Sequence, residues 1–242
     1  MSTDRTVAGS PRPLLELRGV TKVYGQGRAA FPALRGIDVT VQEGEFVAIM
    51  GPSGSGKSTV MNILGCLDTP TTGSYLFRNT RVELLSRRQR ALLRRHYLGF
   101  VFQGFNLLAR TSAIENVELP LLYRGEPFRQ RRSSARAALA SVGLDAWETH
   151  APAELSGGQQ QRVAIARAIV THPALLLADE PTGNLDSQRG REIMELLAAL
   201  SREQGITVLL VTHESEMARY AKRVIHFVDG FVDSDHRNGG SA

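Results

Sequence analysis

A glycine-rich turn that directly follows a short apolar run constrains the fold of this chain more than any other feature. Residues 46–50 are all apolar, and the segment Gly51-Pro-Ser-Gly-Ser-Gly56-Lys57-Ser58-Thr59 follows them. This segment fits the pattern G-x-x-x-x-G-K-[ST], whose glycines let successive backbone N–H groups turn inward toward phosphate oxygens. We therefore expect a buried strand, a phosphate-binding loop and a helix that begins near Lys57.

Each residue type in this loop has a chemical role in holding a nucleoside triphosphate. The helix N-terminus adds a positive dipole end and unpaired N–H donors. Lys57 brings a full charge to the β- and γ-phosphates, and the Ser58 hydroxyl coordinates Mg²⁺. The residues predicted to bind the nucleotide here are Gly51, Ser53, Gly54, Ser55, Gly56, Lys57, Ser58 and Thr59. The loop alone leaves kinases and GTPases open.

A second apolar run, residues 174–178, leads into two adjacent carboxylates, Asp179 and Glu180. A buried strand of this kind delivers Asp179 to the Mg²⁺ site. Glu180, one residue on, can then hold and polarise an attacking water molecule. An isolated acidic pair at a strand end is commonly just solvated, but its occurrence together with the phosphate loop favours a catalytic role.

A third motif, Leu155-Ser156-Gly157-Gly158-Gln159, lies upstream of that strand and opens a helical pattern that runs to residue 170. It resembles the signature of the ABC ATPases. A serine hydroxyl, glycine N–H groups and a helix N-terminus together form a second anion site. The resemblance implies that two copies stack head to tail as a homodimer around two ATP molecules. Ser156, Gly157 and Gly158 of one copy would then bind the nucleotide of the other.

The resemblance also assigns roles to four further residues. Gln103, in Val-Phe-Gln, resembles the glutamine that reaches Mg²⁺ and the attacking water, and His213 resembles the histidine that contacts the γ-phosphate. Tyr24 resembles the aromatic residue that stacks on adenine, and Asp186 belongs to a segment that communicates across the dimer. The expected catalytic residues are Glu180, His213, Gln103 and Lys57. The expected metal ligands are Ser58, Gln103 and Asp179.

The order of apolar runs and helical patterns predicts an α/β fold with a mainly parallel core sheet. With the resemblance, this becomes a P-loop NTPase of the ABC ATPase type, with an antiparallel β layer and an inserted α-helical subdomain at residues 103–170. The expected strands are residues 14–20, 37–41, 46–50, 174–178 and 207–211, with a closing hairpin at 224–228 and 231–232 and a helix at 189–204. The ATPase domain covers residues 14–233. Residues 1–13 and 234–242 are polar and are expected to be disordered.

The composition and charge of the chain argue against a nucleic-acid partner and against a membrane-spanning segment. The net charge of +5 is small for 242 residues and predicts no nucleic-acid partner. No apolar run approaches the roughly 18 to 20 residues of a membrane span, and the start lacks the apolar core of a secretion signal. Cys66 is the only cysteine, which rules out an internal disulfide and predicts a small buried hydrophobe. We expect a protein that stays in the cytosol.

Three segments resemble the macrolide-exporter and lipoprotein-release branch of the ABC ATPases: residues 100–108, 115–125 and 181–186. This resemblance implies a separate transmembrane permease and a peripheral position on the cytoplasmic side of the inner or plasma membrane. Phe102, Phe105 and Leu107 are candidate permease contacts, with a core role equally possible for each. Two arginine runs are read as solvated helical faces: Arg87, Arg88, Arg90, Arg94 and Arg95, and Arg129, Arg131 and Arg132.

Two other functions share the same motifs. An ABC ATPase that acts on nucleic acid or chromosomes typically carries a long coiled-coil insertion, zinc-binding cysteines or two cassettes in tandem, and the sequence shows none of these. A nucleotide-dependent regulatory clamp on a membrane complex uses the same cassette without moving cargo. The sequence leaves this clamp open.

Overall fold

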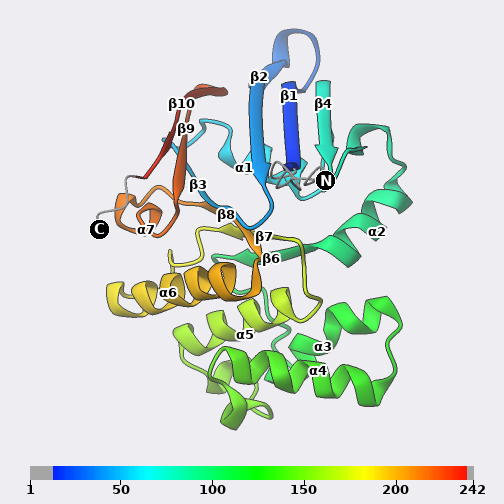
Figure 1. Cartoon of the computed structure of the whole chain (residues 1–242), viewed down its shortest axis with the longest axis vertical. Helices are drawn as coiled ribbons and strands as arrows, with labels where there is room; N and C mark the ends of the chain where they lie inside the picture. Colours follow the sequence, from blue (N-terminus) through cyan, green and yellow to red (C-terminus); the bar gives the residue numbers. More distant parts are fainter. Residues whose placement is uncertain (1–12, 239–242) are drawn as a thin grey trace, which may run out of the picture.

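The strands form two sheets in a computed structural model that describes residues 13–238, without the side chain of Arg28 (Figure 1). One sheet is antiparallel in the order β2-β1-β4-β5, and the other has six strands in the order β10-β9-β3-β8-β7-β6. The strands are β1 Pro13–Tyr24, β2 Phe31–Gln42, β3 Phe46–Met50, β4 Thr72–Phe77, β5 Thr80–Arg81, β6 Leu98–Phe102, β7 Leu175–Asp179, β8 Thr207–Val211, β9 Arg223–Val228 and β10 Phe231–Arg237. The predicted α/β fold class is confirmed.

Most of the larger sheet is parallel. Strands β6, β7, β8, β3 and β9 all run in the same direction, and β10 closes one edge as an antiparallel partner of β9. Phe102 pairs with Asp179, and Asp179 in turn pairs with Val211. The last residues of these neighbouring strands therefore lie side by side at one edge of the sheet.

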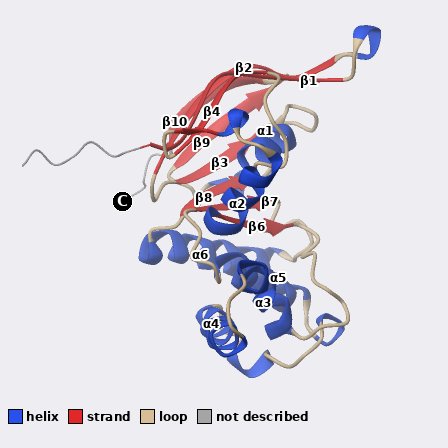
Figure 2. Ribbon diagram, turned by 90° about the vertical axis from the view of Figure 1, so that its right-hand side faces the viewer, coloured by secondary structure: helices blue, strands red, loops and turns tan. Residues whose placement is uncertain are grey.

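The larger sheet is buried on both faces, which explains its uninterrupted apolar runs. Val47 and Ile49 of β3 point into a core shared with the antiparallel sheet and α1. Ala48 and Met50 alternate with them and point into a second core shared with the helices. Figure 2 shows the resulting order of antiparallel sheet, central sheet and helices.

Seven α-helices complete the described part of the chain: α1 Lys57–Leu64, α2 Arg87–Tyr97, α3 Ala113–Arg124, α4 Phe128–Ser141, α5 Gly157–Ile169, α6 Ser187–Gln204 and α7 Ser215–Ala218. Short 3-10 turns lie at Gly27–Ala29, Val82–Leu84, Asp145–Trp147 and Pro152–Glu154. Helices α3, α4 and α5 fall within the predicted helical subdomain and lie below the central sheet in Figure 1.

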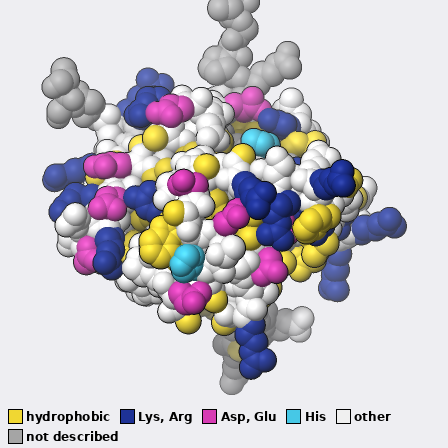
Figure 3. Space-filling view, turned by 90° about the horizontal axis from the view of Figure 1, so that it is seen from below, with side chains coloured by type: hydrophobic (Ala, Val, Ile, Leu, Met, Phe, Trp, Pro, Cys, Tyr) yellow, Lys and Arg dark blue, Asp and Glu magenta, His cyan; other side chains and the backbone are white. Residues whose placement is uncertain are grey.

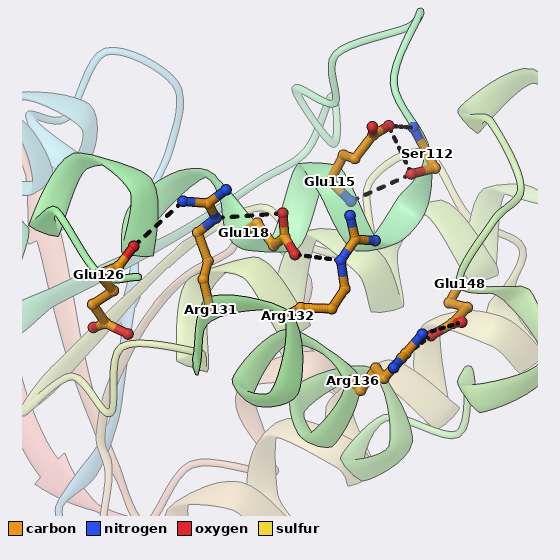
Figure 4. A network of polar contacts seen from close by, with 8 residues as sticks. All are labelled: Ser112, Glu115, Glu118, Glu126, Arg131, Arg132, Arg136 and Glu148. Atoms are coloured by element: carbon orange, nitrogen blue, oxygen red, sulfur yellow. Dashed lines mark hydrogen bonds and ion pairs between the residues drawn. The ribbon is translucent and has the colours of Figure 1, made fainter. Parts of the chain in front are cut away.

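Local capping sets the start of α3, and a buried ion-pair network joins α3 to α4 (Figure 4). Ser112 accepts a hydrogen bond from the Glu115 N–H, and the Glu115 carboxylate accepts one from the Ser112 N–H, forming a capping box. Glu118 is only 6% exposed and pairs with Arg131 at 3.4 Å and Arg132 at 2.7 Å. The prediction that these two arginines are simply solvated was therefore wrong, because they neutralise a buried carboxylate.

The sequence analysis did not predict four elements: β4, β5, β6 and α7. Strand β6 is short and lies between the arginine-rich α2 and Gln103, so it carried little periodic signal. Its Gly99 allows a close approach to α5, because a Cβ atom there would lie 2.5 Å from the Ala168 carbonyl oxygen. Gln103 thus follows the end of a central strand.

The end of the chain also differs from the prediction, which placed a disordered tail at residues 234–242. Strand β10 continues to Arg237, because Arg223 of β9 pairs with Asp235 at 2.6 Å and the His226 and His236 rings stack 5.6 Å apart. At the other end, Pro13 begins β1. The remaining predicted disordered residues, 1–12 and 239–242, lie outside the described residues.

Between residues 13 and 238, no helix is both long and apolar enough to cross a bilayer.

We predict that Cys66 is unreactive in the folded protein. Its side chain is 1% exposed, and burial raises the pKa of the thiol to about 11, so the reactive thiolate is scarce near neutral pH. Ellman's reagent at pH 8 should label no thiol in native protein and one per chain after unfolding in guanidinium chloride. Fast labelling of the native protein would contradict this placement.

Candidate active site

Four parallel strands end side by side, and each is followed by a predicted site residue. In the sheet order β3-β8-β7-β6, these residues are the Gly51 loop, His213, Glu180 and Gln103. Backbone hydrogen bonds extend this order past the strands, since the Glu180 N–H donates to the Val211 carbonyl at 2.9 Å. Residues far apart in the sequence are therefore brought to one edge.

A cleft of about 790 Å³ lies along this edge. It is lined by Phe31, Ala33, Gly51, Pro52, Ser53, Gly54, Gly56, Lys57, Ser58, Thr59, Gln103, Asp179, Glu180, Val211 and His213. All four predicted catalytic residues and all three predicted metal ligands are in this lining.

The glycine loop has the geometry of an anion cradle. Gly51 has φ 147°, and a Cβ atom there would lie 2.1 Å from the Phe227 carbonyl oxygen, so the chain passes where no side chain fits. Gly56 is the N-cap of α1 and contributes no side-chain hydrogen bond. The first N–H groups of α1 are thus left without a side-chain cap, which is what a bound phosphate requires.

Lys57 and Asp179 bring opposite charges to the lining of the cleft. The Lys57 ammonium group donates to the carbonyl oxygens of Gly51 and Pro52, both at 2.8 Å, and so lies over the loop. Burial and the charge of Glu180 raise the pKa of Asp179, and Lys57 opposes this rise. The Asp179 carboxylate and the Ser58 hydroxyl both line the cleft and offer the oxygen ligands that Mg²⁺ prefers, so these residues fit the ion.

Glu180 is held in an unusual conformation and touches His213. Its φ of 47° is rare for a residue with a side chain and costs on the order of 1 to 3 kcal/mol. Its Oε1 atom lies 2.7 Å from Nδ1 of His213. The hydrogen bond and charge of Glu180 raise the pKa of His213, whose side chain is 65% exposed. The pair therefore faces the cleft and stays accessible.

Gln103 is tied to the segment that follows Glu180. Its side-chain amide donates to Oδ1 of Asn184 at 3.3 Å, and the Asn184 amide donates to the Gln103 carbonyl at 2.9 Å. A Cβ atom on Gly183 would lie 2.6 Å from the Gln103 side chain. These contacts join the loop after β6 to the loop after β7, so a displacement of one loop would displace the other.

Other predicted nucleotide contacts lie outside this cleft: Tyr24, Ser55, Ser156, Gly157, Gly158 and Asp186. Ser156 caps α5 through its hydroxyl, which accepts from the Gln159 N–H at 3.4 Å. Asp186 caps α6 and accepts from the Arg189 N–H at 2.9 Å. The Ser55 hydroxyl is buried, and no hydrogen-bond partner is found for it among the described residues.

Phe31 and Ala33 of β2 line the cleft, although neither was predicted from the sequence. Phe31 is exposed and pairs with Tyr24 across the β1–β2 ribbon. Their position depends on the register between the two strands, which no local motif reveals. An aromatic residue near the end of a strand was the only available signal.

Comparison with known proteins agrees with this geometry. The profile of the ABC transporter family matches residues 34–183. The macrolide export ATP-binding/permease protein MacB of Marinobacter nauticus is 52% identical over 226 residues, which cover 93% of this chain and 35% of that protein. The pyoverdine export ATP-binding/permease protein PvdT of Pseudomonas syringae is 53% identical, covering 92% of this chain and 34% of that protein. The chain spans about a third of the length of these curated relatives.

Two solved structures share both fold and sequence. A dimeric structure of the bacterial ABC transporter cassette MJ0796 has a TM-score of 0.85 and 46% identity, covering 93% of this chain and 99% of that one. A post-hydrolysis dimer of the same cassette, bound to ADP and Pi, has a TM-score of 0.85 and 45% identity, again covering 93% and 99% of the two chains. Both similarities extend over almost the whole described fold.

We predict that the charge of Glu180 controls the protonation of His213. The carboxylate stabilises the imidazolium, so the ring keeps its proton to higher pH than usual and loses it as the pH rises through the raised pKa. NMR titration of the His213 ring, assigned with His213→Gln, should show a lower pKa in Glu180→Gln. Glu214→Gln is the control and should shift the pKa less. Equal shifts in both variants would contradict the assignment.

Proposed function

The chain belongs to the ABC transporter family, and we propose on this premise that it binds and hydrolyses ATP to power a membrane permease. One observation carries the proposal. A glycine loop with an uncapped helix N-terminus, a lysine, an Asp–Glu pair, a histidine and a glutamine all line the same cleft. A structural glycine turn needs none of the other groups.

The loop and Lys57 bind the triphosphate. Backbone N–H groups at the start of α1 point toward an anion, and the helix dipole favours negative charge there. The ammonium group of Lys57, which lies over the loop, can exchange its carbonyl partners for phosphate oxygens. Phosphoryl transfer depends mainly on such positioning and charge stabilisation.

The Ser58 hydroxyl and the Asp179 carboxylate would hold Mg²⁺, with Gln103 nearby. When bound, the ion would neutralise negative charge that develops on the phosphates. Burial and the charge of Glu180 raise the pKa of Asp179, and the charge of Lys57 counteracts both. The ionised carboxylate is therefore favoured when a cation is close.

Glu180 is the general base of the proposed reaction. It follows Asp179 directly, lines the cleft, and accepts a proton from the water that attacks the γ-phosphorus as the bond from that phosphorus to ADP breaks. His213 holds the Glu180 carboxylate through the 2.7 Å contact and can reach toward the γ-phosphate from the end of the neighbouring strand. The unusual φ of Glu180 is consistent with a carboxylate held for catalysis.

The signature residues supply the proposed second half of each site. Ser156, Gly157 and Gly158 are at the N-terminus of α5 and are absent from the lining of their own cleft. A second copy stacked head to tail would bring them to its partner's nucleotide. The dimeric cassettes with 45% and 46% identity support this homodimer.

An apolar groove is the proposed docking site of the permease. Its cavity of about 590 Å³ is formed by α2, β6, α3 and α5 and includes Phe102, Pro120 and Tyr123. Tyr123 is 67% exposed, and Phe102 directly precedes Gln103, so an occupant could influence the catalytic edge. Leu107, also a candidate contact, packs against the core instead. The protein would then sit peripherally on the cytoplasmic side of the membrane.

The surface of the helical side has no single dominant charge. Seen from below in Figure 3, basic, acidic and apolar side chains are interspersed. This pattern suits a protein partner better than nucleic acid, which selects extended basic surfaces. The relatives named as ATP-binding/permease proteins support a permease and an export role.

We predict that Glu180→Gln binds ATP normally but hydrolyses it about 10² to 10⁴ times more slowly, the usual cost of losing a general base. Phosphate release measures turnover, and a fluorescent ATP analogue measures binding. Glu203→Gln, the same substitution on an exposed carboxylate of α6, should keep wild-type turnover. Wild-type turnover in Glu180→Gln would remove this residue from the role.

Transport itself needs a separate measurement. Copurification with a membrane protein, followed by ATP-dependent cargo flux in vesicles, should show both ATPase stimulation and flux. Stimulation without flux would instead favour the regulatory clamp.

A further inference from the structure

Tyr24 is fixed by a group of residues that the proposed hydrolysis does not use. The Tyr24 hydroxyl donates to Oδ2 of Asp68 at 3.0 Å. The ammonium group of Lys22 binds Oδ1 of the same carboxylate at 2.6 Å and lies 4.9 Å from the centre of the Tyr24 ring. Lys22 and Tyr24 are near the end of β1, whereas Asp68 lies in the loop after α1.

Asp68 is itself held rigidly. Lys22 also donates to the Thr69 carbonyl at 2.9 Å, and the Thr69 N–H donates to Oδ1 of Asp68 at 2.7 Å. Burial raises the pKa of Asp68, but the hydrogen bonds from Lys22, Thr69 and Tyr24 outweigh it and hold the pKa below its usual value. The carboxylate is therefore a fixed anion with both oxygens in use.

The same hydroxyl brings Tyr24 close to the phosphate loop. The Thr59 side chain lies near this hydroxyl, and Thr59 directly follows Ser58 in the first turn of α1. Lys22 is one of only three lysines in the whole sequence, with Lys57 and Lys222. The partly exposed ring of Tyr24 thus lies near the first turn of α1 and is bonded to the loop after α1 through Asp68.

We propose that Asp68, held by Lys22, is a positioning residue that fixes the Tyr24 ring as the platform on which the adenine of ATP stacks. This inference rests on the proposed function, because it assumes that ATP is the ligand of the adjacent cleft. An exposed tyrosine without this bond is free to rotate about its side-chain torsions, and a base that stacks on it must first order it. The Asp68 bond orders the ring before the nucleotide arrives.

A simple alternative is that Asp68 only fastens β1 to the loop after α1. The two roles differ in what they change. If Asp68 only fastens the two segments, its loss should lower the folding stability and weaken the affinity for every ligand to the same extent. If Asp68 positions the Tyr24 ring, its loss should weaken the affinity only for ligands that carry a base, and only while that ring is present.

The experiment compares ATP with tripolyphosphate, which has the phosphates but no base. Asp68→Ala should raise KM and Kd for ATP about 3- to 10-fold, the size of one hydrogen bond's net contribution, with kcat unchanged. Its affinity for tripolyphosphate should match wild type. Asp68→Asn keeps an acceptor for the Tyr24 hydroxyl but loses the charge that Lys22 binds. Its KM for ATP should therefore lie between those of the wild type and Asp68→Ala.

A double-mutant cycle tests whether Asp68 influences ATP affinity through the Tyr24 ring. In a Tyr24→Ala background, which lacks the ring, Asp68→Ala should cause no further loss of ATP affinity. Glu43→Ala is the control, because it removes an exposed carboxylate that follows β2 and pairs with Arg78 in the turn after β4, away from Tyr24 in the sequence. This control should bind both ligands like wild type.

Three results would overturn the inference: equal loss of ATP and tripolyphosphate affinity, no loss of ATP affinity in Asp68→Ala, or an undiminished loss in the Tyr24→Ala background. If Asp68→Ala does not fold, the Asp68→Asn series decides by the same criteria. Failure of the proposed function gives a different result, namely wild-type protein that neither binds nor hydrolyses ATP.

Discussion

Parallel hydrogen bonding between β3, β8, β7 and β6 is the constraint on which the rest of the structure depends. Parallel strands have their carboxyl ends at the same edge, so the loops that leave neighbouring strands start side by side. The glycine loop, His213, Glu180 and Gln103 are gathered in this way. A one-residue slip of β7 against β8 would turn the side chains of β7 to the opposite face of the sheet and move Glu180 away from His213.

This edge also supports the strained parts of the site. Gly51 passes the Phe227 carbonyl at a distance that admits no side chain, and Glu180 has a positive φ and donates its N–H to Val211 of β8. Such conformations persist only when the surrounding structure fixes them. The two apolar cores, one on each face of the sheet, supply that rigidity.

How much could be predicted from the sequence depends on where each signal resides. The phosphate loop and the Asp179–Glu180 pair are predictable, because each motif lies in one segment together with its strand. The resemblance to the ABC ATPases supplied Gln103 and His213, and the structure brings both to the cleft. Phe31, Asp68 and the pairing of Glu118 with Arg131 escaped prediction, since each depends on contacts between distant segments that carry no local pattern.

The central claim is that one chain carries two half-sites, each completed by a second copy. Analytical ultracentrifugation of Glu180→Gln with saturating ATP tests it most directly. The account predicts a dimer, twice the chain mass of 26.5 kDa. It also predicts that adding Ser156→Arg leaves a monomer that still binds ATP. A Glu180→Gln protein that stays monomeric with ATP bound, or a double variant that dimerises equally well, would contradict the account.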